Sequence, residues 1–210
     1  MEGLLYAEKA LNLEEGWLCL DFANTLDWHA SSHPIESIET YADLVNWSAR
    51  VGLFGAEEAE TLMRTAQELP GEAEQTRLRA IELREAIYQI FSALSHDREP
   101  SDRDIAALNL YLSQEMANSR IVRKEDGFDW GFTRDANALD RMLGPIARSA
   151  AELLASDVLD RVGECADEDG CGWLFLDTTR NHSRQWCSME SCGNRAKAKR
   201  HYRRKKTAEN

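Results

Sequence analysis

The chain has 210 residues, of which 43% are apolar and 30% are charged, and its formal net charge at pH 7 is −12. This composition indicates a globular protein rather than a disordered one, and the length suits one ordinary domain with a small appendix. No run of about eighteen apolar residues occurs and no basic region opens the N-terminus, so the sequence predicts neither a membrane span nor a secretory signal, but a cytoplasmic protein.

The first predicted helix covers residues 16–27 and carries polar side chains beside an apolar stripe. Its Cys19 has no basic neighbour to lower the thiol pKa, so we interpret it as a small buried hydrophobic residue. Asp21, Asn24 and Asp27 are spaced by three residues and could line a pocket in a helical bundle. Hydrogen bonding at the helix end is the competing interpretation, which the residues alone favour.

Helical periodicity continues through the body of the chain, with one exception. Ser37 caps a predicted helix that ends near Gly52, and two further helices are predicted over residues 56–69 and 72–95. Ser101 caps the next predicted helix. The last one runs from Asp135 to about Ser156, and Gly144–Pro145 should kink or break it. In helix 72–95, Leu78 and Ile87 should face inward. Arg84 falls near this stripe, where a paired or snorkelling arginine is a simpler interpretation than a ligand anchor. The exception is the alternation in residues 128–132, which with residues 120–123 predicts a two-stranded hairpin.

Sequence signatures of catalysis are missing. The chain contains no Gly-x-Gly-x-x-Gly turn, Walker loop, Gly-x-Ser-x-Gly elbow or His-Glu-x-x-His helix. Its many carboxylates at helical spacing are typical of a solvated acidic face. We therefore predict no enzymatic activity.

The strongest pattern is a group of four cysteines near the C-terminus, Cys165, Cys171, Cys187 and Cys192. Four thiolates are the ligand set of a closed, structural zinc site, and a reducing compartment disfavours disulfides. The sequence therefore predicts one structural Zn²⁺, with disulfides or a redox role as alternatives. Residues 173–176 are predicted to form a strand that residues 182–186 pair with, and residues 195–206 a helix. This order is that of a treble-clef-like finger.

Charge is distributed unevenly along the chain. Residues 178–210 have a balance of +8, so the remaining residues have a balance of −20. An acidic body with a basic end is typical of a protein whose end meets a polyanion. The candidate nucleic-acid-binding residues are Arg180, Asn181, Arg184, Arg195, Lys197, Lys199, Arg200, Arg203 and Arg204. Some of them, Arg184, Arg195 and Lys197, could instead surround the anionic metal site, and a solvated tail or a surface for an acidic protein are further alternatives.

At this point the residues resemble a known family. The pattern of the CGNR zinc-finger proteins is matched by Arg184, Trp186–Met189, Cys192–Arg195, Lys197–Ala198 and Tyr202–Arg204, and upstream by Trp173–Asp177 and Thr179–Asn181. Residues 20–27 are similar to the start of the ABATE domain, which precedes this finger in bacterial proteins. The resemblance implies a stress-induced transcriptional regulator, with a helical domain suspected of sensing a ligand and a finger suspected of binding DNA. It also adds weight to Asn24, Thr25 and Asp27 as pocket residues.

The sequence thus predicts a mainly α fold in two parts. Residues 1–158 form a helical domain with one β-hairpin, and residues 159–210 form a small zinc finger with a β-hairpin and a basic C-terminal helix. We expect a zinc-dependent, DNA-binding transcriptional regulator whose helical domain binds a small molecule, through Asn24, Thr25, Asp27 and Arg84, or forms a homodimer. An RNA-binding protein, an enzyme with a pocket in the helical domain and a protein-interaction adaptor are the alternatives.

Overall fold

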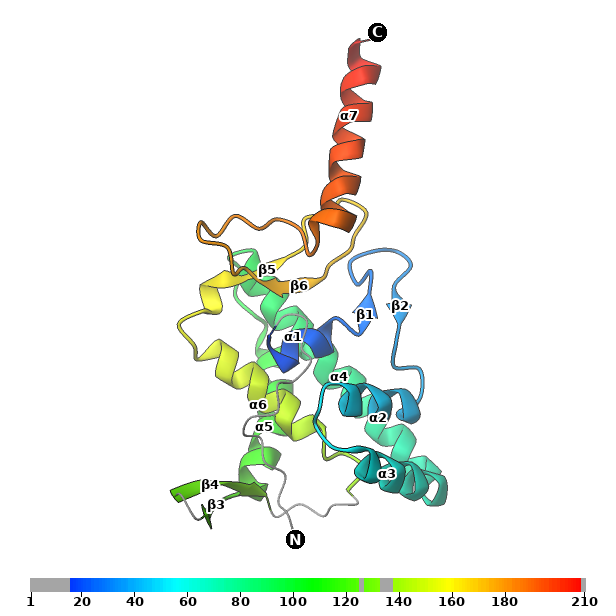
Figure 1. Ribbon diagram of the computed structural model, residues 1–210, viewed down its shortest axis with the longest axis vertical. Coiled ribbons are helices and arrows are strands. Elements are labelled where there is room, and N and C mark those ends of the chain that lie inside the picture. The colour runs from blue at the N-terminus through cyan, green and yellow to red at the C-terminus, as the bar shows by residue number, and fades with distance from the viewer. Residues whose placement is uncertain (1–15, 125–126, 133–137, 209–210) are drawn as a thin grey trace.

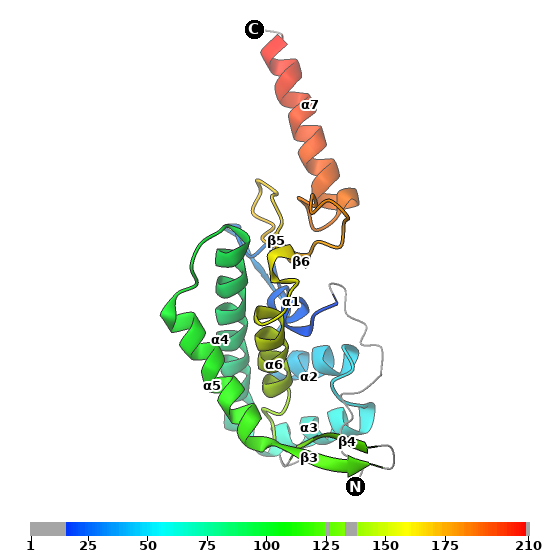
Figure 2. The same ribbon diagram turned by 90° about the vertical axis from the view of Figure 1, so that its left-hand side faces the viewer.

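The computed structural model describes residues 16–124, 127–132 and 138–208, and it is mainly helical (Figure 1). The helices of the body are α1 (Leu18–Ala23), α2 (Tyr41–Arg50), α3 (Ala56–Glu68), α4 (Pro70–Ser95), α5 (Asp102–Asn118) and α6 (Leu143–Leu154). A further helix, α7 (Asn194–Ala208), extends away from the body in both views (Figures 1 and 2). Among the described residues, no helix combines the length and apolarity that a membrane crossing requires.

Helix α4 is the central element of the body, and α1, α2, α3, α5 and α6 all contact it. Its buried residues include Leu83, Ile87 and Ile90, which recur every three or four positions and so share one side of the helix. The prediction that Ile87 faces inward is confirmed. The same prediction for Leu78 is wrong, because Leu78 lies about 200° around the helix from the buried Ala80 and is 52% exposed.

Three helix ends differ from the sequence prediction. Helix α2 is capped by Thr40 rather than Ser37, because Thr40 and Asp43 complete a reciprocal capping box. Helix α6 begins at Leu143, so Gly144–Pro145 lie in its first turn and do not break it, as the tolerance of proline near a helix N-terminus explains. The expected start of that helix, residues 135–137, lies outside the described residues. Helix α1 ends at Ala23, which removes residues 24–27 from it.

Helices α5 and α6 approach each other closely at Gly144. A Cβ atom at this position would lie 1.9 Å from Oε2 of Glu115, a buried residue of α5. A side chain there would have to displace the Glu115 carboxylate, so Gly144 serves the packing of the two helices rather than a kink.

The predicted hairpin of the body is confirmed as β3 (Ser119–Lys124) paired with β4 (Gly127–Phe132). It lies at the end of the molecule opposite α7 (Figures 1 and 2). A second pair of very short strands, β1 (Leu26–Asp27) and β2 (Ile35–Glu36), follows α1. Strand β1 occupies the end of the segment that was predicted to be the first helix.

The C-terminal part contains a hairpin of different composition from the predicted one. Strand β6 (Leu174–Leu176) pairs with β5 (Val162–Glu164), which precedes the first cysteine of the group. The predicted partner, residues 182–186, is not a strand, because the buried carboxylate of Asp177 accepts hydrogen bonds from the backbone N–H groups of Thr179 and Arg184. These bonds hold the chain in a closed loop instead of a returning strand.

The β5–β6 hairpin packs on the body and does not stand apart from it. Val162 and Leu174 belong to the same buried cluster as the helices, and β5 contacts α4. The side chain of Asn24 donates to the carbonyl oxygen of Leu174 at 2.8 Å and accepts from its N–H at 2.9 Å. The Asn24 amide therefore satisfies both backbone groups of Leu174 in β6, as a neighbouring strand would, and it joins the C-terminal part to the body.

Candidate metal centre

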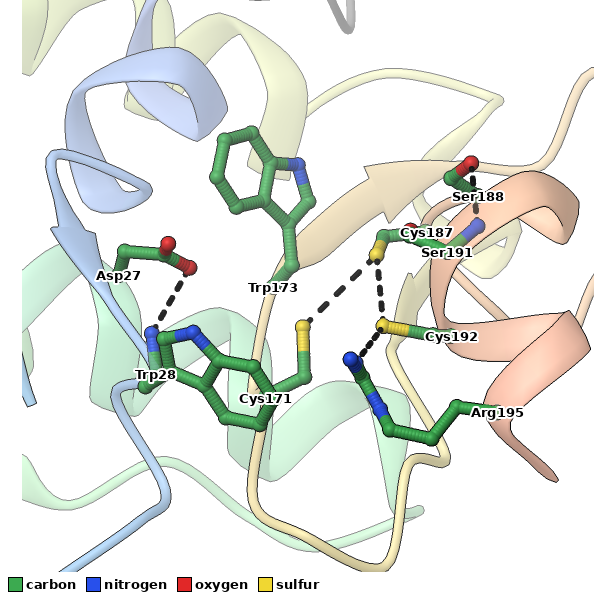
Figure 3. Close-up of a pocket in the computed structure, with 9 residues that line it drawn as sticks. All are labelled: Asp27, Trp28, Cys171, Trp173, Cys187, Ser188, Ser191, Cys192 and Arg195. Carbon is green, nitrogen blue, oxygen red and sulfur yellow. Dashed lines mark hydrogen bonds between the residues drawn. The ribbon is translucent and has the colours of Figure 1, made fainter. Parts of the chain in front are cut away.

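The four predicted metal ligands, Cys165, Cys171, Cys187 and Cys192, lie together. Their sulfur atoms are all within 4.8 Å of one another. The Sγ atom of Cys187 lies 3.7 Å from Sγ of Cys171 and 3.5 Å from Sγ of Cys192 (Figure 3). These separations are far longer than the ~2.05 Å of a disulfide bond. They match the ~3.8 Å between sulfurs that tetrahedral Zn–S bonds of about 2.3 Å require.

Backbone hydrogen bonds bring the cysteines to this position from three segments. Cys165 follows β5, and its N–H donates to the carbonyl oxygen of Trp173 at 2.9 Å, which closes the loop that carries Cys171. Cys192 lies in a single π-helical turn, Met189–Gly193, which leads into α7. The hydroxyl oxygen of Ser188 accepts from the N–H groups of Glu190 and Ser191 and so caps this turn.

The thiols titrate as one cluster because their sulfur atoms are in contact. Hydrogen bonds from Cys171 and Cys187 lower the pKa of the Cys165 thiol to about 2, and the hydrogen bonds of Cys187 with Cys165 and Cys171 raise the pKa of Cys187. The bond to Cys165 also raises the pKa of Cys171 to about 12. Zinc binding at neutral pH therefore displaces protons from the cluster, so that its affinity rises with pH. Cys19 lies apart from this cluster, in the core of the body, as predicted. Its burial raises the pKa of its thiol to about 12.

Two of the three basic residues that the alternative interpretation places around the metal site, Arg184 and Arg195, lie beside the cysteine cluster, whereas Lys197 is exposed. Nη2 of Arg195 lies 3.0 Å from Sγ of Cys192 and 2.6 Å from Oδ2 of Asp167 (Figure 3 shows its guanidinium beside Cys192). The Arg184 guanidinium donates to the carbonyl oxygens of Leu176, Trp186 and Cys187 and lies over the Phe175 ring. Donors of this kind stabilise the negative charge of a four-thiolate site and orient its ligands.

The loop after β1 packs directly against the cysteine cluster. The N–H of His29 donates to the carbonyl oxygen of Cys171 at 3.1 Å, and Trp28 stacks under the Arg195 guanidinium at 4.7 Å. Gly172 permits this approach, because its φ is +68° and a Cβ atom there would lie 2.8 Å from the backbone nitrogen of Ala30. The metal centre is therefore built partly on the body.

The comparisons with known families agree with this architecture. Residues 16–157 match the ABATE family, described as "Putative stress-induced transcription regulator". The chain belongs to the ABATE family. Residues 161–205 match the CGNR zinc finger, and together with the sulfur geometry this match assigns the four cysteines to one zinc ion. The comparison with curated proteins found no match to this chain.

The predicted nucleic-acid-binding residues of the ABATE protein fall into two groups. Arg180 and Asn181 lie in the loop closed by Asp177, and Arg184 is engaged with backbone carbonyls, so the predicted hairpin edge carrying these residues does not form. The others lie along α7: Arg195, Lys197, Lys199, Arg200, Arg203 and Arg204. This helix begins at the zinc centre and extends beyond it (Figure 1).

The predicted ligand-binding residues of the ABATE protein are separated by the fold. Arg84 and Thr25 lie together, with Nη1 of Arg84 3.4 Å from Oγ1 of Thr25, but Arg84 is only 1% exposed and forms a two-bond ion pair with Glu36. Asn24 binds the backbone of Leu174. Asp27 lines a cavity whose volume is about 380 Å³.

This cavity lies where the body meets the finger (Figure 3). Asp27, Trp28 and Trp173 line it from one side, and Ser188, Ser191 and Arg195 from the other, with Cys171, Cys187 and Cys192 between them. Because three of the zinc ligands line the cavity, part of its volume belongs to the metal site. Sequence reasoning missed Trp28 and the acidic loop around Asp167, although the acidic run between Cys165 and Cys171, shortly before the basic segment, is a visible signal.

Proposed function

We propose that the protein is a DNA-binding transcriptional regulator whose zinc finger presents α7 to duplex DNA. The observation that carries this proposal is the way in which α7 is attached to the metal centre and projects from the body. Its N-terminal end is tied to the metal centre by Cys192 and Arg195, and the rest of this strongly basic helix extends beyond the body (Figure 2). The family description of a transcription regulator supports the same function.

Charge and groove shape favour duplex DNA as the partner. The balance of −20 on the rest of the chain repels a polyanion, so contact is confined to the basic end. The major groove of B-DNA, about 12 Å wide, admits an α-helix, whereas the major groove of double-stranded RNA is too narrow for side chains to read. Structured RNA, whose loops are accessible, is the rival target.

The expected result is selective binding of duplex DNA by the full, zinc-loaded chain. Selection from random DNA duplexes and from structured RNA pools, followed by fluorescence anisotropy at several salt concentrations, measures it. Binding should weaken steeply with salt, by about 0.9 log units per log unit of salt for each phosphate contact. The variant Arg120→Gln is the control for a general effect of charge. It removes an exposed cation on the distant β3, so it should leave binding unchanged. Enrichment of RNA alone supports the RNA-binding rival, and no enrichment supports the adaptor.

For the body, we propose that a small molecule is sensed in the cavity beside Asp27. The cavity is lined by both parts of the chain, so a ligand there would contact the loop after β1 and the residues leading into α7 at once. A carboxylate, two hydroxyls and two indole rings suit a polar, partly aromatic ligand of small size. In this proposal Asn24 and Arg84 hold the structure around the site and do not touch the ligand.

A panel of metabolites tested by thermal unfolding checks this proposal. A binder present at about 100 times its Kd should stabilise the native state by about 2.7 kcal/mol and raise Tm accordingly. Asp27→Asn should reduce the shift, while Asp157→Asn, which changes an exposed acid in the turn after α6, should leave it unchanged. A binder whose shift is the same in all three proteins places the site elsewhere, and chemical conversion of a binder supports the enzyme rival. The homodimer, the cytoplasmic location and the division at residue 158 stay predictions.

A further inference from the structure

The basic residues of α7 are divided between two sides of the helix, and one side is already paired. Arg195, Lys199 and Arg203 are spaced by four residues and therefore form one stripe. The loop between Cys165 and Cys171 lies along this stripe and contributes its acidic residues to it. The paired charges are 28, 30 and 35 positions apart in the sequence, so no local pattern predicts that they meet.

Each cation of the stripe has its own acidic partner in that loop. Arg195 Nη2 lies 2.6 Å from Oδ2 of Asp167, and Lys199 contacts Asp169. At the next turn, Arg203 makes two hydrogen bonds to Glu168, of 2.6 and 3.2 Å, with Nη2 and Nη1.

The hydrogen bond from Arg203 lowers the pKa of Glu168. Three carboxylates face the three cations, so this stretch of the helix side is nearly neutral in sum. Lys206 continues the same side at its far end, where no ion pair involves it within the described part of the chain.

The opposite side of α7 carries Lys197, Arg200 and Arg204. At about 100° per residue these three positions lie within about 60° of one another and are centred about 130° away from the paired stripe. All three are exposed, and within the described part of the chain no ion pair joins them to an acidic residue. They are positive charges available to an external anion.

We propose that nucleic acid phosphates are bound by the side of α7 that carries Lys197, Arg200 and Arg204, and that the acidic loop holds the other side away from the duplex. The inference rests on the proposed function and adds the orientation of the helix. Cations that already have carboxylate partners release no condensed counterions from DNA, so Lys199 and Arg203 contribute little to binding. The carboxylates beside them repel phosphates and disfavour the reverse orientation.

The experiment compares two sets of substitutions in the full, zinc-loaded chain. Arg200→Gln/Arg204→Gln removes two cations from the open side. Lys199→Gln/Arg203→Gln/Glu168→Gln/Asp169→Asn removes both exposed ion pairs and leaves the net charge unchanged. Anisotropy titrations against one duplex at several salt concentrations give Kd and the salt slope, and zinc content with circular dichroism confirms that α7 is intact.

We expect Arg200→Gln/Arg204→Gln to weaken binding at least tenfold and to reduce the salt slope by about 1.8, the value for two phosphates. The fourfold variant should bind within about twofold of the unmodified chain, because two acids leave with two bases. The reverse ranking overturns the inference, as does an equal loss in both. If the unmodified chain binds no duplex, the proposed function fails and the inference with it.

A second measurement uses the unmodified chain, so its outcome does not depend on the stability of a variant. Acetylation of lysines by an amine-reactive ester is followed by mass spectrometry with and without the duplex. Lys197 should be protected several-fold by DNA, while the modification of Lys199 should be unchanged. Protection of Lys199 without protection of Lys197 overturns the proposed orientation.

Discussion

Replacing Cys192 with serine should remove zinc from the protein and release α7 from the rest of the finger. A serine hydroxyl is a poor zinc ligand, and structural zinc sites contribute about 10–16 kcal/mol of apparent binding free energy at pH 7. Loss of one thiolate should cost zinc affinity about 100-fold or more, or roughly 3 kcal/mol. The zinc content after gel filtration and the amide hydrogen exchange of α7 measure the two effects.

The matched control is Cys19→Ala. Cys19 is the fifth cysteine, is fully buried in α1 and is not part of the metal cluster. This variant should keep one zinc per chain, although it removes a buried sulfur. The β5–β6 hairpin should stay protected in Cys192→Ser, because Val162 and Leu174 pack in the core of the body. One zinc per chain and unchanged exchange of α7 in Cys192→Ser would contradict the assignment of the ligands.

The parts of the fold that the sequence predicted are those fixed by local chemistry. The spacing of four cysteines indicated the metal ligands, and helical periodicity indicated most of the body helices. The cap at Ser101 was predicted because the hydroxyl and the N–H of Asp104 are three residues apart, and the structure confirms it. Such signals need no knowledge of distant segments.

The parts that were missed depend on partners far along the chain. Asn24 was assigned to a pocket or to a helix end, but its partner is Leu174, which is 150 positions away. Strand β6 was recognised, yet its partner β5 lies before Cys165, where three residues give no periodic signal. The loop after Asp177 resembled a returning strand because only the folded chain shows two N–H groups converging on that carboxylate.

The candidate nucleic-acid interface shows the same limit. Composition identified a basic segment, and the helical spacing divided its residues into two sides. Which side is open could not be predicted, because the acidic loop comes to lie on α7 only once the zinc ligands are assembled: the loop is bounded by Cys165 and Cys171, and α7 starts beside Cys192. Charge pairing between Glu168 and Arg203 is a tertiary contact in an otherwise local module.

The second prediction concerns the buried ion pair between Arg84 and Glu36. Glu36→Gln should lower the free energy of unfolding by about 2–4 kcal/mol, measured by urea denaturation. Breaking a buried ion pair commonly costs about 3–5 kcal/mol, and the carboxylate side chain here is 29% exposed, which reduces the effect. The amide of glutamine can accept one bond but cannot replace both bonds of 2.6 and 2.7 Å from the guanidinium. Glu85 remains beside Arg84 and limits the loss further.

The matched control is Glu74→Gln, which breaks an ion pair within α4, between Glu74 and Arg77. Glu74 is exposed, so its removal should change stability little.

The pH dependence of the stability difference separates the electrostatic effect of Glu36 from its packing. Burial opposes ionisation of Glu36, but the hydrogen bonds from Arg84 outweigh it and lower its pKa, so the ionised carboxylate stabilises the native state above the ordinary glutamate range. That contribution is lost as pH falls through the lowered pKa, and the difference between the wild type and Glu36→Gln should shrink in acid. A difference that is constant with pH would mean that Glu36 stabilises the fold through its shape rather than its charge.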